Sequence, residues 1–180
     1  EMRPLFKGWE RADSIVVNPH KWLFTPFDLS VLYLKDLDKL KQAFSLTPEY
    51  LKNDEQGRVL NLMDTGVQLG RRFRSLKLWM IFRCFGLEGM RQRIAFHLQL
   101  ARYLADQIEQ SEHFELALPV NMSLVCFRWK GKSNEQQMEL MNRLNEGGKF
   151  FISHTKIKDQ ILLRCAIGHI RARHTDIDLF

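Results

Sequence analysis

A short apolar run that stops in a polar turn constrains the fold of this chain more than any other stretch. Ile15, Val16 and Val17 are β-branched and are expected to form a buried strand. Pro19 ends that strand because proline cannot donate to a ladder, and Lys21 follows in the turn. Ligands in open α/β sheets lie beyond the strand ends, so we expect Lys21 to lie at a ligand site.

The residues after Lys21 favour a reactive amine. Trp22, Leu23 and Phe24 follow it directly, and partial removal from water would favour the neutral, nucleophilic form of its side chain. Such a lysine suits Schiff-base chemistry. The alternative is a solvated surface lysine, because one lysine after a strand is a weak motif.

The string Asn18-Pro-His-Lys-Trp22 resembles the cofactor-lysine motif of the group II pyridoxal-phosphate-dependent decarboxylases. That family contains the aromatic-L-amino-acid, histidine and glutamate decarboxylases. The resemblance continues along the chain in the family's order, in FDLS (27–30), LTPEYLK (46–52), LGRRFRSLKLW (69–79), LVCFR (124–128) and LLRCAI (162–167). The eleven residues of 69–79 are the most specific of these segments.

The remaining patterns predict a strand at 29–34, a helix from the Asp36 cap to about Ala43, and helices at 71–85 and 87–110 separated by Gly86. Strands are expected at 114–118, 123–129, 150–153 and 160–167, with a helix at 134–147. The resemblance implies an α/β fold in which residues 1–76 end the large domain of a fold-type I pyridoxal-phosphate enzyme. Residues 77–180 would then form a small α+β C-terminal domain that is truncated.

The resemblance implies pyridoxal 5'-phosphate as the cofactor, held covalently by Lys21. His20, Asn18 and Ser14 are expected to contact the phosphate or the linkage to the lysine. Gly70 is also expected to contact the cofactor, because it would directly precede the helix predicted from Arg71, where free backbone N–H groups favour anions.

A second group of residues is expected to bind the substrate: Phe27, Gly70 and Arg164. By resemblance, aromatic decarboxylases carry glycine at the position that matches Gly70, whereas histidine decarboxylases tend to carry serine there. Arg164 lies in an otherwise apolar strand and needs a partner, either a substrate carboxylate or a structural salt bridge. Tyr50 matches the tyrosine of the family's mobile catalytic loop, expected at about 44–67, which reaches the active site of the neighbouring subunit in a homodimer.

Arg71, Arg72, Arg74 and Lys77 cluster at the start of the helix expected from Arg71. Cations oppose the helix dipole at that end, so we expect these side chains to have carboxylate or phosphate partners. The alternative is a set of inter-domain salt bridges.

Several functional classes are not favoured. The formal net charge is +6, from 27 basic and 21 acidic residues, and the basic residues are scattered, so no nucleic-acid face is expected. Three distant cysteines favour thiols in a reducing, cytoplasmic compartment, and the histidine spacing does not match a metal site. No apolar run is long enough to span a bilayer.

The resemblance to the decarboxylase family implies a carboxy-lyase that converts an aromatic L-amino acid to its amine and carbon dioxide. Two alternatives stay open: an aldehyde-forming oxidative deaminase of the same family, and a non-catalytic dimerisation or binding module with this fold. The chain begins at Glu1, and the resemblance places most of the cofactor pocket upstream. Residues 1–180 alone are therefore expected to be inactive.

Overall fold

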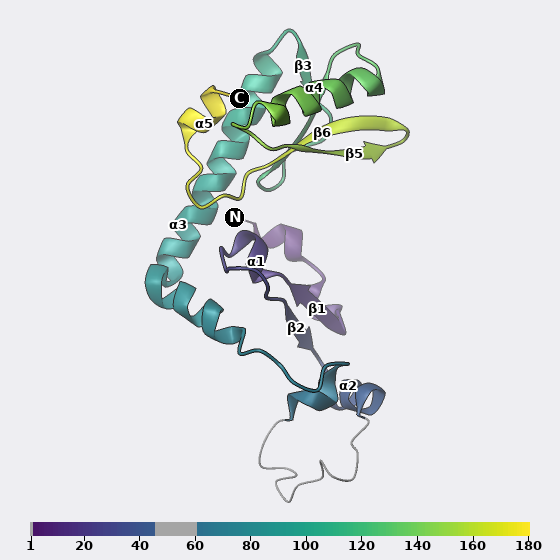
Figure 1. Ribbon diagram of the computed structural model, residues 1–180, viewed down its shortest axis with the longest axis vertical. Coiled ribbons are helices and arrows are strands. Elements are labelled where there is room, and N and C mark those ends of the chain that lie inside the picture. The colour runs from purple at the N-terminus through teal and green to yellow at the C-terminus, as the bar shows by residue number, and fades with distance from the viewer. Residues whose placement is uncertain (1, 46–60) are drawn as a thin grey trace, which may run out of the picture. The chain divides into compact units, whose positions relative to one another are not determined.

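The computed structural model describes residues 2–45 and 61–180 (Figure 1). Its contacts divide the chain into two compact units, Glu1–Arg83 and Cys84–Phe180. Tyr50 lies outside the described residues.

The N-terminal unit is built on a two-stranded antiparallel ribbon. Strands β1 (Ser14–Val17) and β2 (Val31–Leu34) pair in a register that sets Val17 opposite Val31. The position of the predicted first strand is confirmed, but its expected burial is wrong, because the ribbon has two strands and Val16 is 61% exposed. The second strand begins two residues later than expected, at Val31. The residues before it, Leu29 and Ser30, bond to the turn that carries Lys21 instead of to the ladder.

Short helices complete this unit: η1 (Arg3–Phe6), η2 (Trp9–Arg11), α1 (Pro19–Trp22), α2 (Leu37–Phe44) and η4 (Leu62–Thr65). The predicted cap of α2 is confirmed, because the Asp36 carboxylate accepts hydrogen bonds from the N–H groups of Asp38 at 3.0 Å and Lys39 at 3.2 Å. The segment expected as a loop at about 44–67 includes the described turn η4.

Helix α3 (Ser75–Gln110) is longer than either helix predicted in its region. Gly86 interrupts it with φ 66° and ψ 169°, a backbone conformation that glycine adopts without a Cβ clash. The predicted break at Gly86 is therefore confirmed. The predicted start at Arg71 is wrong, because residues 71–73 are not helical.

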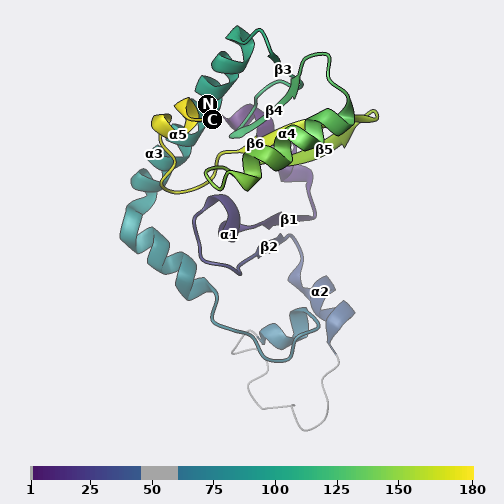
Figure 2. The ribbon, with the colours of Figure 1, turned by 45° about the horizontal axis from the view of Figure 1, so that its top comes forward.

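The C-terminal unit contains an antiparallel sheet in the order β3-β4-β6-β5. Its strands are β3 (Phe114–Leu116), β4 (Leu124–Trp129), β5 (Ser153–Ile157) and β6 (Gln160–Ala166). Figure 2 shows helix α4 (Asn134–Glu146) beside β6 and β5, and the short helix α5 (His174–Asp178) ends the chain. A capping box between Ser133 and Gln136 starts α4 at its predicted position.

The expected strand at 150–153 is wrong by three residues. The apolar run Phe150–Ile152 does not enter the ladder, because the Asn145 side chain bonds both the N–H and the carbonyl of Ile152, at 2.8 and 2.9 Å. The Ile152 side chain is buried in the core, whereas Phe151 is 85% exposed. The paired strand β5 instead consists largely of polar residues. It lies at the sheet edge, where polar side chains discourage pairing with another chain.

Residues from α3, α4 and the sheet share one apolar core in the C-terminal unit. Leu100 of α3, Val125 of β4 and Leu163 of β6 are fully buried there, with Met141 of α4 beside them. Side chains alternate between the two faces of a strand, so Val125 and Phe127 of β4 point to the same face, and both belong to this core.

Within the described ranges, the structure has no helix with the length and apolar character needed to cross a membrane. No group of three or more potential metal ligands occurs among the residues at 2–45 and 61–180.

Candidate active site around Lys21

Lys21 lies in the connection between β1 and β2, residues 18–30, which begins with the short helix α1. Pro19 occupies the first turn of α1, where its missing N–H costs no hydrogen bond, and its ring is buried. The Lys21 N–H donates to the Asn18 carbonyl at 3.0 Å, and the Thr25 N–H donates to the Pro19 carbonyl at 3.1 Å. The Lys21 backbone is therefore held by its own turn.

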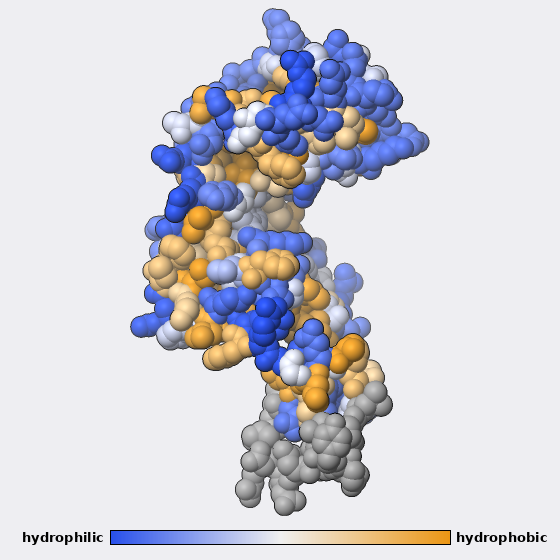
Figure 3. Space-filling model, viewed as in Figure 1, coloured by the Kyte–Doolittle hydropathy of each residue, from blue (hydrophilic) through white to orange (hydrophobic). Residues whose placement is uncertain are grey.

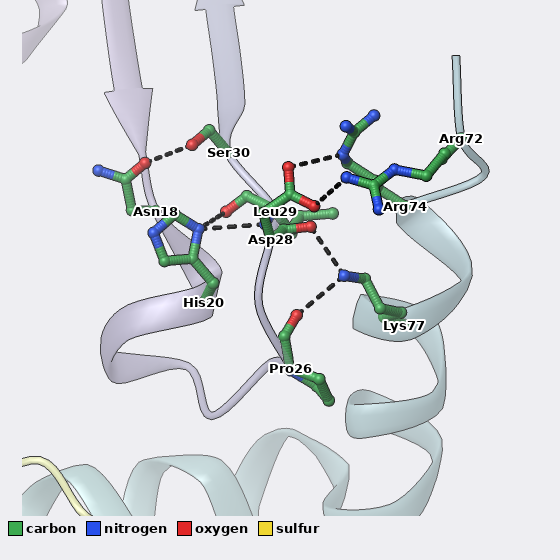
Figure 4. Close-up of polar contacts among 9 residues, drawn as sticks. All are labelled: Asn18, His20, Pro26, Asp28, Leu29, Ser30, Arg72, Arg74 and Lys77. Carbon is green, nitrogen blue, oxygen red and sulfur yellow. Dashed lines mark hydrogen bonds and ion pairs between the residues drawn. The ribbon is translucent and has the colours of Figure 1, made fainter.

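Side chains from the same turn tie it to the entry of β2 (Figure 4). The Ser30 hydroxyl donates to Asn18 Oδ1 at 2.5 Å. The Leu29 N–H donates to His20 Nδ1 at 3.1 Å, and the Leu29 carbonyl oxygen lies 2.5 Å from the same nitrogen. Since one ring nitrogen either accepts or donates, the tautomer of His20 decides which of these two contacts is a hydrogen bond.

The amine of Lys21 is exposed, which contradicts the expected partial desolvation by Trp22, Leu23 and Phe24. Those three side chains are themselves half-buried, whereas Lys21 faces solvent from the short helix. Ser14, at the start of β1, is also exposed. The turn therefore presents an accessible amine on a backbone that is hydrogen-bonded on both sides.

Asp28 connects this turn to the segment that begins α3 (Figure 4). Its carboxylate accepts from Arg72 Nη2 at 2.7 Å and from Arg74 Nε at 3.1 Å. Lys77 Nζ donates to the backbone carbonyls of Asp28 at 2.7 Å and Pro26 at 2.9 Å. Three cations thus fix the backbone between Lys21 and β2, and we call Asp28, Arg72, Arg74 and Lys77 the Asp28 cluster.

Sequence reasoning predicted carboxylate partners for the basic residues, and Asp28 confirms this for Arg72 and Arg74. Arg71 instead donates to the Thr65 hydroxyl at 3.2 Å. The alternative of inter-domain salt bridges is wrong for Arg72 and Arg74, because these arginines and their shared partner Asp28 all belong to the N-terminal unit. Asp28 itself received no predicted role, since spacing along a chain does not reveal a contact over more than forty residues.

The environment of Asp28 favours its ionised form. Partial burial alone would raise the pKa of this carboxyl, but a backbone hydrogen bond, the Arg74 hydrogen bond and the charges of Arg72 and Arg74 outweigh it and lower the pKa. The stabilisation from these contacts is therefore present at neutral pH and is lost as the pH falls through the lowered pKa.

We expect Asp28→Asn to loosen the backbone at residues 26–30, because a neutral amide replaces the shared charge. Hydrogen exchange of these amides in the complete protein would measure the change. A double-mutant cycle should give stronger coupling of Asp28 with Arg74, whose side chain is 24% exposed, than with Arg72, which is 74% exposed. Equal exchange rates in wild type and Asp28→Asn would contradict this role.

Gly70 does not directly precede a helix, which corrects the predicted reason for its importance. Helix α3 begins at Ser75, and the intervening arginines extend toward Asp28 and Thr65 instead of entering the first helical turn. Gly70 is exposed, and a Cβ built on it meets no atom within 4 Å. A larger side chain therefore fits there without a clash inside the described chain.

The other predicted substrate residues differ in their surroundings. Phe27 is 85% exposed, and its ring lies edge-on to His20 with the centroids 5.0 Å apart. Arg164 belongs to β6 of the C-terminal unit, where its guanidinium donates to the Ser153 hydroxyl at 3.2 Å. Its partner in the described part of the chain is thus a neutral hydroxyl and not the carboxylate of a structural salt bridge. The substrate-binding roles of both residues stay predictions.

The residues of the turn fit a pyridoxal cofactor in their chemistry. An accessible primary amine is the group that binds an aldehyde, and the exposed Phe27 and half-buried His20 provide flat surfaces beside it. The hydrogen bonds of Asn18 and His20 with Ser30 and Leu29 use Oδ1 and Nδ1. The amide nitrogen of Asn18 and Nε2 of His20 are therefore the atoms with which these two residues would serve a ligand.

A family comparison agrees with this chemistry. The model of the pyridoxal-dependent decarboxylase conserved domain matches residues 1–130, which include the whole turn and the Asp28 cluster.

Curated proteins similar to the chain include enzymes with two kinds of name. A phenylacetaldehyde synthase of Arabidopsis thaliana is 43% identical over 176 residues, which cover 93% of this chain and 36% of that protein. An aromatic-L-amino-acid decarboxylase of Drosophila melanogaster is 44% identical over 167 residues, covering 93% of this chain and 32% of the relative. The chain thus spans about a third of the length of these two relatives.

Solved structures resemble the chain over nearly its full length. The crystal structure of Oryza sativa TDC with PLP and tryptamine gives a TM-score of 0.92 at 36% identity, and covers 99% of this chain and 39% of that one. The crystal structure of Rhodiola rosea 4-hydroxyphenylacetaldehyde synthase gives 0.85 at 26% identity, with coverages of 98% and 37%.

Proposed function

Because the chain belongs to the family of pyridoxal-dependent decarboxylases, we propose that the complete protein decarboxylates an aromatic L-amino acid to its amine and carbon dioxide. The observation that carries the proposal is the exposed amine of Lys21, held in a turn that His20, Leu29 and the Asp28 cluster fix from two directions. Relatives named for aromatic substrates support the substrate class.

The cofactor, when bound, supplies an electron sink for the charge left at the α-carbon when carbon dioxide departs. In this proposal Lys21 Nζ would hold the cofactor and would release it to the substrate amine. Asn18 and His20 orient the cofactor beside the turn, and Phe27 contacts the aromatic ring of the substrate. Tyr50 delivers the proton that completes the amine product.

The Asp28 cluster serves this chemistry indirectly. Its hydrogen bonds hold the backbone that follows Lys21 in one position, and no direct contact with the cofactor or the substrate is part of this proposal. Catalysis depends strongly on such placement, since a displacement of about 1 Å at the reacting groups costs about 10²-fold in rate. Asp28 is therefore a positioning residue in this proposal.

Aldehyde formation is the second candidate, and the relative named phenylacetaldehyde synthase favours it. In that reaction the amino acid, dioxygen and water would give the aldehyde, carbon dioxide, ammonia and hydrogen peroxide. Dioxygen would accept the two electrons lost by the carbon–nitrogen bond. The two candidates share carbon dioxide but differ in every other product.

Product analysis of the complete protein therefore tests the proposal. Purified protein with pyridoxal 5'-phosphate would be given tyrosine, tryptophan, phenylalanine, dihydroxyphenylalanine, histidine and glutamate in separate reactions. We expect carbon dioxide and amine in equal amounts from an aromatic substrate, with no dioxygen uptake. Aldehyde and hydrogen peroxide in equal amounts would establish the second candidate, and turnover of histidine or glutamate alone would contradict the substrate class.

We also propose that the complete protein is a homodimer. Large apolar side chains are exposed just before α3 and in its first turns, including Phe73 at 74%, Trp79 at 58% and Met80 at 55%. Figure 3 shows hydrophobic residues at the surface of the described chain. Large apolar side chains exposed in such number on one segment favour a surface that another chain covers. The proposed active site would receive Tyr50 from the neighbouring subunit.

Gly70→Ser is expected to change the substrate preference. A serine hydroxyl would fill space beside the substrate and offer a hydrogen bond to an imidazole, whereas glycine leaves room for a flat apolar ring. We expect kcat/KM to fall for the aromatic substrates and to rise for histidine. Each change corresponds to about 1–3 kcal/mol in activation free energy. Since a Cβ meets no atom within 4 Å, the variant should fold. An unchanged ratio of the two kcat/KM values would remove Gly70 from the substrate site.

A further inference from the structure

A cavity of about 730 Å³ is lined wholly by residues of the C-terminal unit. Helix α3 and the segment after β6 form its walls. Arginine, aromatic and thiol side chains line it, chiefly Arg93, Arg171, Arg173, Phe85, Phe96 and Cys84. None of its described lining residues is acidic. Three fixed positive charges therefore share one cavity without a negative charge in its walls.

Arg93 has an unsatisfied donor in this cavity. Its Nε is shielded from solvent and has no hydrogen-bond partner, while its guanidinium carbon lies 4.5 Å from the centroid of the Phe85 ring. Among the residues at 2–45 and 61–180, no carboxylate forms an ion pair with Arg93, Arg171 or Arg173. Buried arginine donors normally have acceptors, so this arrangement favours an anionic ligand.

His97 reports the electrostatic character of the cavity. Its side chain is 2% exposed and lines the cavity near Arg93. Burial lowers the pKa of His97, and the charges of His169 and Arg93 act in the same direction, against a hydrogen bond with the His169 backbone. The three arginines of the lining repel a further cation in the cavity, as the Arg93 charge does at His97. An amino acid or an amine is a poorer ligand for this cavity than an acid without an amino group.

We propose that this cavity binds a small aromatic carboxylic acid that lacks an amino group. Its carboxylate would accept from Arg93, with Arg171 and Arg173 contributing charge, and its ring would pack against Phe85 and Phe96. The guanidinium fork matches a carboxylate in geometry. The site does not depend on the reaction proposed for Lys21, because all of its lining residues belong to the other unit.

Cys84 provides a direct readout because it is exposed and lines the cavity. Burial raises the pKa of Cys165 to about 11 and also raises that of Cys126, so both thiols react slowly near neutral pH. Alkylation of the complete protein by N-ethylmaleimide, followed by mass spectrometry of the Cys84 peptide, measures access to the cavity. Phenylacetate, 2-phenylethanol and phenethylamine would serve as probes with the same ring but different charge.

We expect phenylacetate to slow Cys84 alkylation saturably, and the two other probes to have little effect. Arg93→Met keeps the packing on Phe85 but removes the charge, and should weaken protection by about tenfold. Arg173→Gln should weaken it in the same direction, and is decisive if Arg93→Met does not fold. Arg102→Met, an exposed arginine of α3 outside the cavity lining, should leave protection unchanged.

Three results would overturn the proposal. Equal protection by phenethylamine and phenylacetate would show that ring burial alone governs the cavity. Protection that survives Arg93→Met and Arg173→Gln would place the carboxylate elsewhere. A Cys84 that resists alkylation without any probe would show that the complete protein fills the cavity with its own residues.

Discussion

Lys21→Ala in the complete protein is expected to abolish covalent cofactor attachment and to lower kcat/KM for decarboxylation by about 10³-fold or more. The variant removes the only group in the turn that can bond to an aldehyde and then be released by the substrate amine. Because Lys21 is exposed and its turn is fixed by backbone contacts, the fold should survive the change. Activity assays together with absorbance of the bound cofactor would measure both effects.

Two matched variants make that result specific. Lys21→Arg retains the positive charge but cannot form the covalent bond, so it should be as inactive as Lys21→Ala. Lys35→Ala removes another lysine of the same unit. In the described chain, Lys35 Nζ lies 4.0 Å from the carboxylate of the exposed Asp13. Such a surface pair contributes little, and Lys35→Ala should stay active. Comparable activity of Lys21→Ala and wild type would remove Lys21 from the reaction.

Tyr50→Phe is expected to divert the reaction from amine to aldehyde and ammonia. In the proposed reaction the tyrosine hydroxyl delivers a proton to the α-carbon, and its loss leaves that carbon open to dioxygen. Cofactor attachment at Lys21 should be unchanged. The ratio of aldehyde to amine, measured with dioxygen uptake, would follow the diversion.

Tyr33→Phe is the control for Tyr50→Phe, since Tyr33 is 60% exposed on β2 and lacks a proposed role. It should give amine in wild-type yield. Full amine yield from Tyr50→Phe as well would mean that another group supplies the proton.

Local sequence signals predicted the elements that depend on nearby residues. The apolar run before Pro19 predicted β1, the Asp36 carboxylate predicted the start of α2, and Gly86 predicted the break in α3. Each of these features is determined within a few residues of where it occurs. Family resemblance, and not periodicity, identified the role expected of Lys21.

Features that depend on distant contacts could not be predicted in the same way. Helix α3 begins at Ser75 and not at the predicted Arg71. Asp28, more than forty residues earlier in the chain, binds Arg72 and Arg74 in the segment before the helix. The exposure of Lys21 likewise depends on how its neighbours pack. At 150–153 the apolar composition indicated a strand, but Ile152 fills the core while the polar residues that follow form the edge strand β5.

The central claim is that Lys21 holds the cofactor, and mapping the attachment site tests it most directly. The complete protein would be incubated with pyridoxal 5'-phosphate, reduced with borohydride and digested, and the modified lysine located by mass spectrometry. We predict that the label lies on the peptide with Asn18-Pro-His-Lys-Trp22, at Lys21, in stoichiometric amount. A label on another lysine, or a protein that takes up none, would contradict the account and favour a binding module with this fold.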